Sequence, residues 1–182
     1  MSDHSQTVVD QDATESESPR LGAFIHQWLI DEGIVSADAT DCVLSSDAGY
    51  APGPNYEKAT SVPKANLLSL ITNGLDIITK RNIFDSGEGG FELVCSACSH
   101  RFEGSDAWGD AVDEWYENRG SALLPCPRCG KSKLINEWEH DPAWGFANLG
   151  FQFWNWPQLS DEFIKGIGER LGHRVILVRC MV

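Results

Sequence analysis

Basic residues are scarce in this 182-residue sequence: 14 Lys and Arg stand against 27 Asp and Glu, which gives a formal net charge of −13. The acids are spread along the chain, so the whole surface is expected to be negative. Such a surface repels nucleic acids and the anionic inner leaflet of a membrane. We therefore expect neither of them as a partner, although negative charge also serves solubility alone.

Long apolar runs are also missing. No stretch approaches the roughly 20 consecutive apolar residues that a membrane-spanning helix needs. Residues 1–11 have neither the basic start nor the apolar run of a secretory signal. These absences predict a cytoplasmic protein in a reducing compartment, where cysteines remain thiols or bind metals.

The common enzymatic motifs do not occur either. Gly130-Lys131-Ser132 resembles the end of a phosphate-binding loop, but Pro125 stands where the first glycine of that loop belongs. The dinucleotide-binding, nucleophile-elbow and zinc-protease motifs are missing as well. The sequence therefore leaves the catalytic residues unknown. An enzyme with an unrecognised active site, between the loop at 47–55 and the aromatic stretch at 141–156, stays one alternative.

Four of the six cysteines form two pairs with the spacing Cys-x₂-Cys, namely Cys95 with Cys98 and Cys126 with Cys129. Two intervening residues allow both sulfurs of one tight turn to face the same ion, and two such turns supply the four thiolates of a tetrahedral zinc site. Four protein ligands close the coordination shell and leave no position for a catalytic water. We predict one structural Zn²⁺ ion that stabilises the protein and does not catalyse.

The gap between the two pairs is 27 residues, whereas the simplest zinc ribbons have about 15–20. A helix predicted over 105–119, with Gly120 as its stop, accounts for the excess as an insertion between the two pairs. Gly130 follows the second pair, where such a turn often needs a positive φ, and Ser99 at the same place after the first pair is less suited. The alternatives are an iron–sulfur site, redox-active or unpaired thiols, and replacement of one thiolate by His100.

Periodicity and capping residues predict a mixed α/β fold of the α+β type, in which helices pack on a small sheet. Residues 1–19 are polar and acidic, which predicts a disordered tail. The remainder, 20–182, is predicted to be a single domain with an inserted zinc ribbon at about 91–139 that carries its own helix. The predicted helices span 21–33, 63–72, 105–120 and 160–172. The predicted strands span 42–44, 75–83, 91–94, 134–139, 149–154 and 175–178, the last as a central strand because it is apolar on both faces.

Aromatic residues are concentrated in the stretch 141–156. We expect most of their side chains to form a core against the last helix, with Trp154 or Trp156 as candidates for an exposed contact. The alternative is a binding surface that stacks sugars or bases. Cys42 and Cys180 lie in apolar surroundings and are expected to be buried thiols.

Several short runs, together with both cysteine pairs, resemble a family of uncharacterised bacterial proteins whose members sometimes carry an automatic sugar ABC transporter ATPase label. The resemblance covers roughly residues 21–182 and implies a bacterial origin and a zinc ribbon set in an α/β domain. It implies no mechanism, and the missing phosphate-binding loop gives the ATPase label no physical support. The runs that carry it are 73–78, 84–87, 144–151, 153–157 and 171–175.

These features favour a zinc-stabilised cytosolic module that binds another protein, such as an adaptor or an immunity-type protein. We expect a partner with a basic surface, which contacts Trp154, Trp156 or the helix at 105–119. Besides the enzyme, a second alternative to this protein-binding module is a zinc ribbon that binds nucleic acid. The ribbon segment 91–139 carries nine acids against five bases, and this net charge of −4 argues against nucleic acid.

Overall fold

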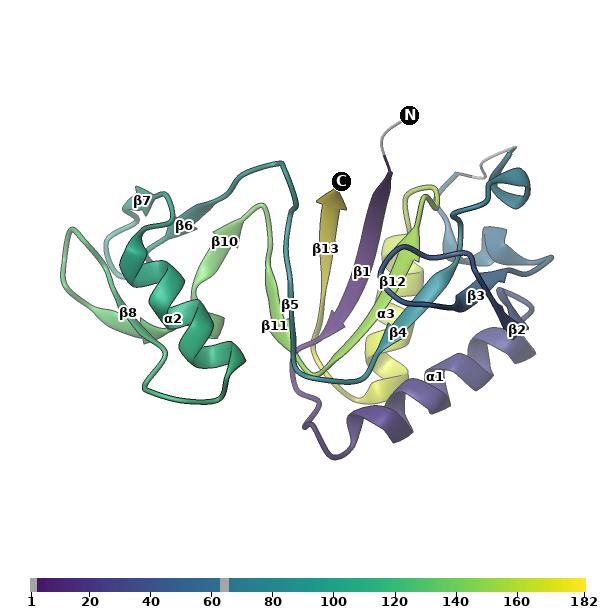
Figure 1. Ribbon diagram of the computed structural model, residues 1–182, viewed down its shortest axis with the longest axis horizontal. Coiled ribbons are helices and arrows are strands. Elements are labelled where there is room, and N and C mark those ends of the chain that lie inside the picture. The colour runs from purple at the N-terminus through teal and green to yellow at the C-terminus, as the bar shows by residue number, and fades with distance from the viewer. Residues whose placement is uncertain (1–2, 63–65) are drawn as a thin grey trace.

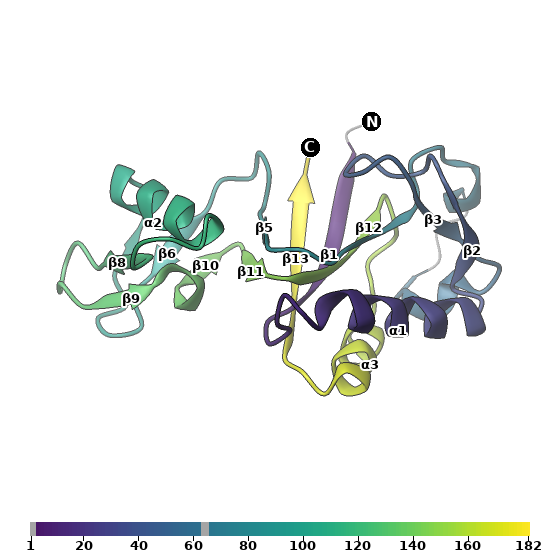
Figure 2. The ribbon, with the colours of Figure 1, turned by 60° about the horizontal axis from the view of Figure 1, so that its bottom comes forward.

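The computed structural model describes residues 3–62 and 66–182. Its largest part is a six-stranded antiparallel sheet with the strand order β13-β1-β12-β4-β3-β2. The strands are β1 (His4–Asp10), β2 (Val35–Thr40), β3 (Gly49–Pro52), β4 (Leu75–Ile78), β12 (Leu149–Trp154) and β13 (Val175–Met181). Two helices, α1 (Ser18–Asp31) and α3 (Asp161–Leu171), pack together against one face of this sheet (Figure 2). This arrangement confirms the predicted α+β class.

A smaller lobe is inserted between β4 and β12, and Figure 1 shows it beside the sheet, at the other end of the molecule. We call residues 91–141 the cysteine lobe. Its elements are β6 (Glu92–Val94), β7 (Arg101–Phe102), α2 (Asp106–Tyr116), β8 (Leu123–Pro125), β9 (Ser132–Leu134), the 3-10 turn η3 (Ile135–Glu137) and β10 (Glu139–Asp141). The lobe has a core of its own, separate from the core between the sheet and its helices. The paired strands β5 (Asn82–Phe84) and β11 (Gly145–Ala147) connect it to the sheet.

Of the disordered tail predicted over 1–19, residues 1–2 lie outside the described residues, and the prediction is wrong for the remainder. β1 lies between β12 and β13 and pairs with both along nearly its whole length. Val8 and Val9 on this strand are fully buried. α1 begins at Ser18, so the predicted domain boundary at residue 20 cuts through the folded structure.

Three buried polar side chains of β1, those of Ser5, Gln6 and Asp10, have hydrogen-bond partners, which explains how a sequence of low hydrophobicity forms an inner strand. Gln6 donates from Nε2 to the carbonyl oxygen of Pro157 at 2.9 Å, and its Oε1 accepts from the backbone N–H of Leu159 at 3.0 Å. The fully buried carboxylate of Asp10 lies 2.8 Å from Nδ1 of His173. This hydrogen bond raises the pKa of His173 above its ordinary value and so favours the charged imidazolium beside the carboxylate.

The segment 41–72 also differs from the prediction. Residues 42–44 are irregular and do not form a strand, whereas β3 lies inside the predicted loop at 47–55. The 3-10 turn η1 (Tyr56–Ala59) follows it. Of the helix predicted over 63–72, residues 63–65 lie outside the described residues, and the rest contains only the short turn η2 (Leu67–Ser69).

Three further strands are placed differently from their predictions. The strand predicted over 75–83 is divided into β4 and β5, which belong to separate sheets. The alternation over 134–139 corresponds to the end of β9, the turn η3 and the start of β10. β13 is an edge strand and not a central one, although its apolar side chains on both faces do pack against core residues.

Helix ends and one strand agree closely with prediction. Ser105 and Ser160 cap α2 and α3, since each side-chain oxygen accepts a hydrogen bond from a backbone N–H three residues later. Gly172 ends α3 with a φ of +72°, and β12 spans 149–154 as predicted. Among the described residues, no helix combines the length and the apolar character that crossing a bilayer requires.

The place of β1 in the sheet can be tested by substituting Val8, whose side chain is fully buried. We expect Val8→Ala to lower the free energy of unfolding by about 2 kcal/mol, because two methyl groups leave a close-packed core. Urea unfolding followed by circular dichroism measures this change. Gln11→Ala, at an exposed position just after β1, is the control and should stay within about 0.5 kcal/mol of the unsubstituted protein. Equal stability of both variants would contradict the burial of β1.

Candidate metal centre

The structure brings the four paired cysteines together at the end of the cysteine lobe. Cys95 and Cys98 lie in the turn between β6 and β7, and Cys126 and Cys129 in the turn between β8 and β9. All four sulfur atoms lie within 4.8 Å of one another. No other group of three or more His, Cys, Asp or Glu side chains in the described part of the chain brings its donor atoms together in this way.

The two turns have the same backbone geometry. In the first, the N–H of Ser99 donates to the carbonyl of Cys95 at 2.7 Å; in the second, the N–H of Gly130 donates to that of Cys126 at 2.9 Å. Both residues have a positive φ, +57° for Ser99 and +73° for Gly130. The local sequence therefore determines two equivalent turns, and each of them directs two sulfurs to a shared point.

The spacing of the sulfurs fits a tetrahedral site. Four sulfurs at about 2.3 Å from a central zinc ion are about 3.8 Å apart along each edge of the tetrahedron. The distances between Cys95 and Cys129 and between Cys98 and Cys126 are both 3.8 Å. The four side chains can therefore hold a metal ion of this size and geometry, with each turn supplying two ligands.

The thiols also alter one another's protonation. Desolvation raises the pKa of Cys126, but hydrogen bonds from the backbone N–H groups of Cys129 and Arg128 and from neighbouring thiols lower it to about 6. The backbone N–H of His100 lowers the pKa of Cys98, but desolvation and the three neighbouring thiols raise it to about 11. One thiolate opposes the formation of the next, so a cation is needed for all four to ionise together.

The metal centre is part of the core of the lobe. Cys95 and Cys126 are 2% exposed, whereas Cys129 is exposed and Cys98 half-buried. The two buried sulfurs belong to the same apolar cluster as Leu93, Leu124, Ile135 and Trp138. An ion bound here would join the β6–β7 and β8–β9 hairpins across this core.

The remaining cysteines and His100 lie outside this centre. Cys42 is buried and packs with Val43 and Trp154. Cys180 is half-buried, and burial together with the charge of Asp85 raises the pKa of its thiol. The ring of His100 stacks on Phe102, with centroids 5.9 Å apart.

The two tryptophans proposed as surface anchors are buried. Trp154 is 5% exposed and donates its indole N–H to Oγ of Ser45, and Trp156 is 1% exposed and donates to the carbonyl of Asn73. The expectation that the aromatic stretch is mostly core is therefore correct, and neither side chain is available to a partner. Trp144 and Phe146 differ from the rest, because their half-buried rings face the cysteine lobe, where Trp144 packs on Phe91 and Phe146 on Trp115.

A polar cavity of about 290 Å³ lies on the face of the sheet opposite the helices. An enzyme could use the polar side chains that line this cavity. The raised pKa of Cys180 keeps the thiol protonated, and a protonated thiol is a poor nucleophile. The polar side chains in its lining are Thr7, Ser45, Lys80, Asn82, Asp85, Tyr116, Gln152 and Cys180.

Comparison with protein-family models, with curated proteins and with solved structures gave no match to this chain. The resemblance to uncharacterised bacterial proteins therefore stays a prediction. The function of this protein therefore has to be inferred from its own residues.

The geometry of the cysteine turns gives a stability prediction. A side chain in the left-handed region costs about 1–2 kcal/mol, which Ser99 incurs and Gly130 avoids. We expect Ser99→Gly to raise the free energy of unfolding by roughly 0.5–1 kcal/mol, after allowing for the greater freedom of glycine in the unfolded chain. Gly130→Ala should lower it by about 1 kcal/mol through φ strain alone, since an added Cβ meets no atom within 4 Å.

Chemical unfolding of the purified variants measures both effects. Ser96→Gly is the matched control, because Ser96 lies in the same turn without a positive φ. A stabilisation by Ser96→Gly as large as that by Ser99→Gly would show that backbone strain at position 99 is not the cause.

Proposed function

We propose that this protein is a zinc-stabilised module of the cytoplasm, an adaptor or immunity-type protein, which binds a protein partner with a basic contact surface through the cysteine lobe. The exposed face of α2 is the observation that carries this proposal. Asp106, Asp110 and Asp113 lie at spacings of four and three residues, so their carboxylates share one side of the helix. Like charges at this spacing destabilise an isolated helix by roughly 0.2–0.5 kcal/mol per pair, which a basic partner would reverse.

Zinc is the ion that the donor set favours. Four thiolates at tetrahedral spacing are typical of structural zinc, and such a closed shell supports a fold and does not activate water. The lobe needs this support because its strands have only two or three residues each. Metal binding supplies much of the folding free energy in small modules of this kind.

Two alternatives have weaker support. Nucleic acid would need a basic face, but Lys133 beside the second cysteine turn is engaged with the carbonyl of Glu137 at 2.8 Å, and α2 is acidic. An enzyme would use the polar cavity on the sheet, where the one thiol is not activated.

The zinc assignment predicts one zinc ion per chain in freshly purified, reduced protein. Cys95→Ser and Cys126→Ser should each lose the metal and unfold the cysteine lobe, because a hydroxyl replaces a thiolate ligand. Elemental analysis and near-ultraviolet circular dichroism measure the two effects. Cys180→Ser, outside the cluster, is the control and should retain the zinc. Metal-free wild-type protein, or an iron content in place of zinc, would contradict the assignment.

The binding function predicts a stoichiometric partner in affinity purification from the native source, identified by mass spectrometry. Bait with Cys126→Ser should lose this partner and bait with Cys180→Ser should keep it, because the cysteine lobe forms the contact. Purification of the chain without a partner, together with hydrolase or transferase activity in a substrate screen, would replace the proposal with the enzyme. A complex with DNA or RNA in a low-salt gel shift would replace it with the nucleic-acid alternative.

A further inference from the structure

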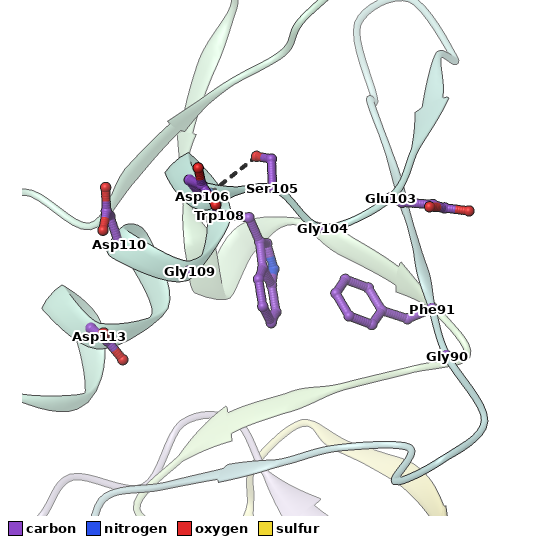
Figure 3. A pocket seen from close by; sticks show the side chains of 10 residues that line it. All are labelled: Gly90, Phe91, Glu103, Gly104, Ser105, Asp106, Trp108, Gly109, Asp110 and Asp113. Carbon is purple, nitrogen blue, oxygen red and sulfur yellow. Dashed lines mark hydrogen bonds between the residues drawn. The ribbon is translucent and has the colours of Figure 1, made fainter.

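An open groove of about 860 Å³ runs beside the start of α2 on the cysteine lobe. We call it the α2 groove. Its lining contains two aromatic rings, four carboxylates and no basic side chain, and the rest is glycine and serine. Figure 3 shows the rings of Trp108 and Phe91 next to each other, with Asp110 and Asp113 on α2, on the side of Trp108 that is away from Phe91. The six side chains are those of Phe91, Glu103, Asp106, Trp108, Asp110 and Asp113.

The aromatic rings of the groove are held in place by their neighbours. The centroids of Phe91 and Trp108 are 4.7 Å apart, and Trp144 contacts both, at 4.6 Å and 5.4 Å. Trp144 donates its indole N–H to Oγ of Ser86 at 3.1 Å, and the ring of His140 stacks on it at 5.5 Å. The rings therefore form a fixed apolar floor before any ligand arrives.

The carboxylates of the groove form no ion pair with any residue that the structure describes. None of the ion pairs found in residues 3–62 and 66–182 uses Glu103, Asp106, Asp110 or Asp113. The four carboxylates also do not converge on a point that could hold a metal ion, in contrast to the four thiols. A ligand that fits must bring positive charge spread over an area, together with a surface that packs on aromatic rings.

A guanidinium group meets both requirements, because it is planar, stacks on aromatic faces and forms paired hydrogen bonds with carboxylates. The chain itself shows this preference. The guanidinium of Arg81 lies 3.8 Å from the ring centroid of Trp115, and that of Arg170 lies 3.9 Å from the ring centroid of Trp28. Neither of these two guanidinium groups lies on Trp108, whose ring lines the open α2 groove.

We propose that the α2 groove binds an arginine side chain from a basic segment of the protein partner. The guanidinium stacks on Phe91 and Trp108, and Asp110 and Asp113 accept its hydrogen bonds. Neighbouring basic residues of the segment face Glu103 and Asp106 at the rim. This inference rests on the proposed function and adds to it the recognised side chain and the surface that recognises it.

The test uses the full zinc-loaded chain and a fluorescein-labelled Gly/Ser peptide that contains three arginines, with fluorescence anisotropy as the measurement. We expect saturable binding at moderate salt and weaker binding of the matching lysine peptide, because an ammonium group cannot stack as a plane. Asp110→Asn combined with Asp113→Asn should weaken binding of the arginine peptide about tenfold.

The control is Asp38→Asn combined with Asp41→Asn, which changes the net charge equally at two exposed positions, one within β2 and one in the residue after it. We expect less than a twofold effect from it. Phe91→Leu keeps an apolar side chain but removes an aromatic face, so it should weaken the arginine peptide more than the lysine peptide. Zinc content and thermal melting of each variant confirm that the lobe is folded.

If both double variants weakened peptide binding equally, overall charge would explain the effect, and the α2 groove would not be the binding site. Equal affinity for the two peptides would overturn the stacking. Failure of this inference is separable from failure of the proposed function. If a partner from affinity purification binds Asp110→Asn/Asp113→Asn as tightly as the wild type, the protein-binding function stands and the α2 groove is not its site.

Discussion

The cysteine lobe depends on one constraint, the convergence of four sulfurs from two hairpins. Its core has nine buried residues, two of which are the cysteines Cys95 and Cys126. Strands of two or three residues provide few backbone hydrogen bonds, and isolated hairpins of this length are marginal in water. A single ion bound by both hairpins would replace the apolar contacts that so short a segment cannot supply. The six-stranded sheet has a larger apolar core, because α1 and α3 cover one of its faces.

The parts of the fold that could be predicted are those whose cause is local in sequence. Cysteine spacing, serine caps and the glycine after α3 act within a few residues, so the cysteine cluster and three helix boundaries were predictable. β1 was not, because its polar side chains are satisfied about 150 residues away, at Pro157 and Leu159. The prediction for β13 failed for a related reason. Apolar side chains on both sides of a strand indicate that both faces of the sheet are covered there, but they do not indicate whether the strand has a neighbour at each edge.

The aromatic stretch shows how the candidate site could be mistaken from sequence. Along β12, Phe151 and Phe153 point to the core under the helices, whereas Gln152 and Trp154 lie on the other face, where Trp154 packs with Cys42. Because side chains alternate between the two faces of a strand, the rings of β12 pack on both faces of the sheet. Trp144, which precedes β11, and Phe146 on β11 contact the cysteine lobe instead. Trp144 packs on Phe91 and Trp108, the two rings that line the α2 groove. The three rings are far apart in sequence, so no local sequence pattern predicts the groove.

Hydrogen bonds and short chain connections link the α2 groove to the four clustered cysteines. The carboxylate of Glu114 on α2 accepts hydrogen bonds from the backbone N–H groups of Ser121 and Ala122 at 3.0 Å and 2.7 Å. Those residues lead directly into β8, and β8 leads to Cys126. On the other side of the groove, Phe91 precedes β6, which ends next to Cys95. Both walls of the groove are therefore attached to strands that an ion bound by the four cysteines would hold together. Separation of the two hairpins would displace Trp108 and the aspartates of α2 from Phe91. The shape of the groove would then depend on a metal ion that lies outside it.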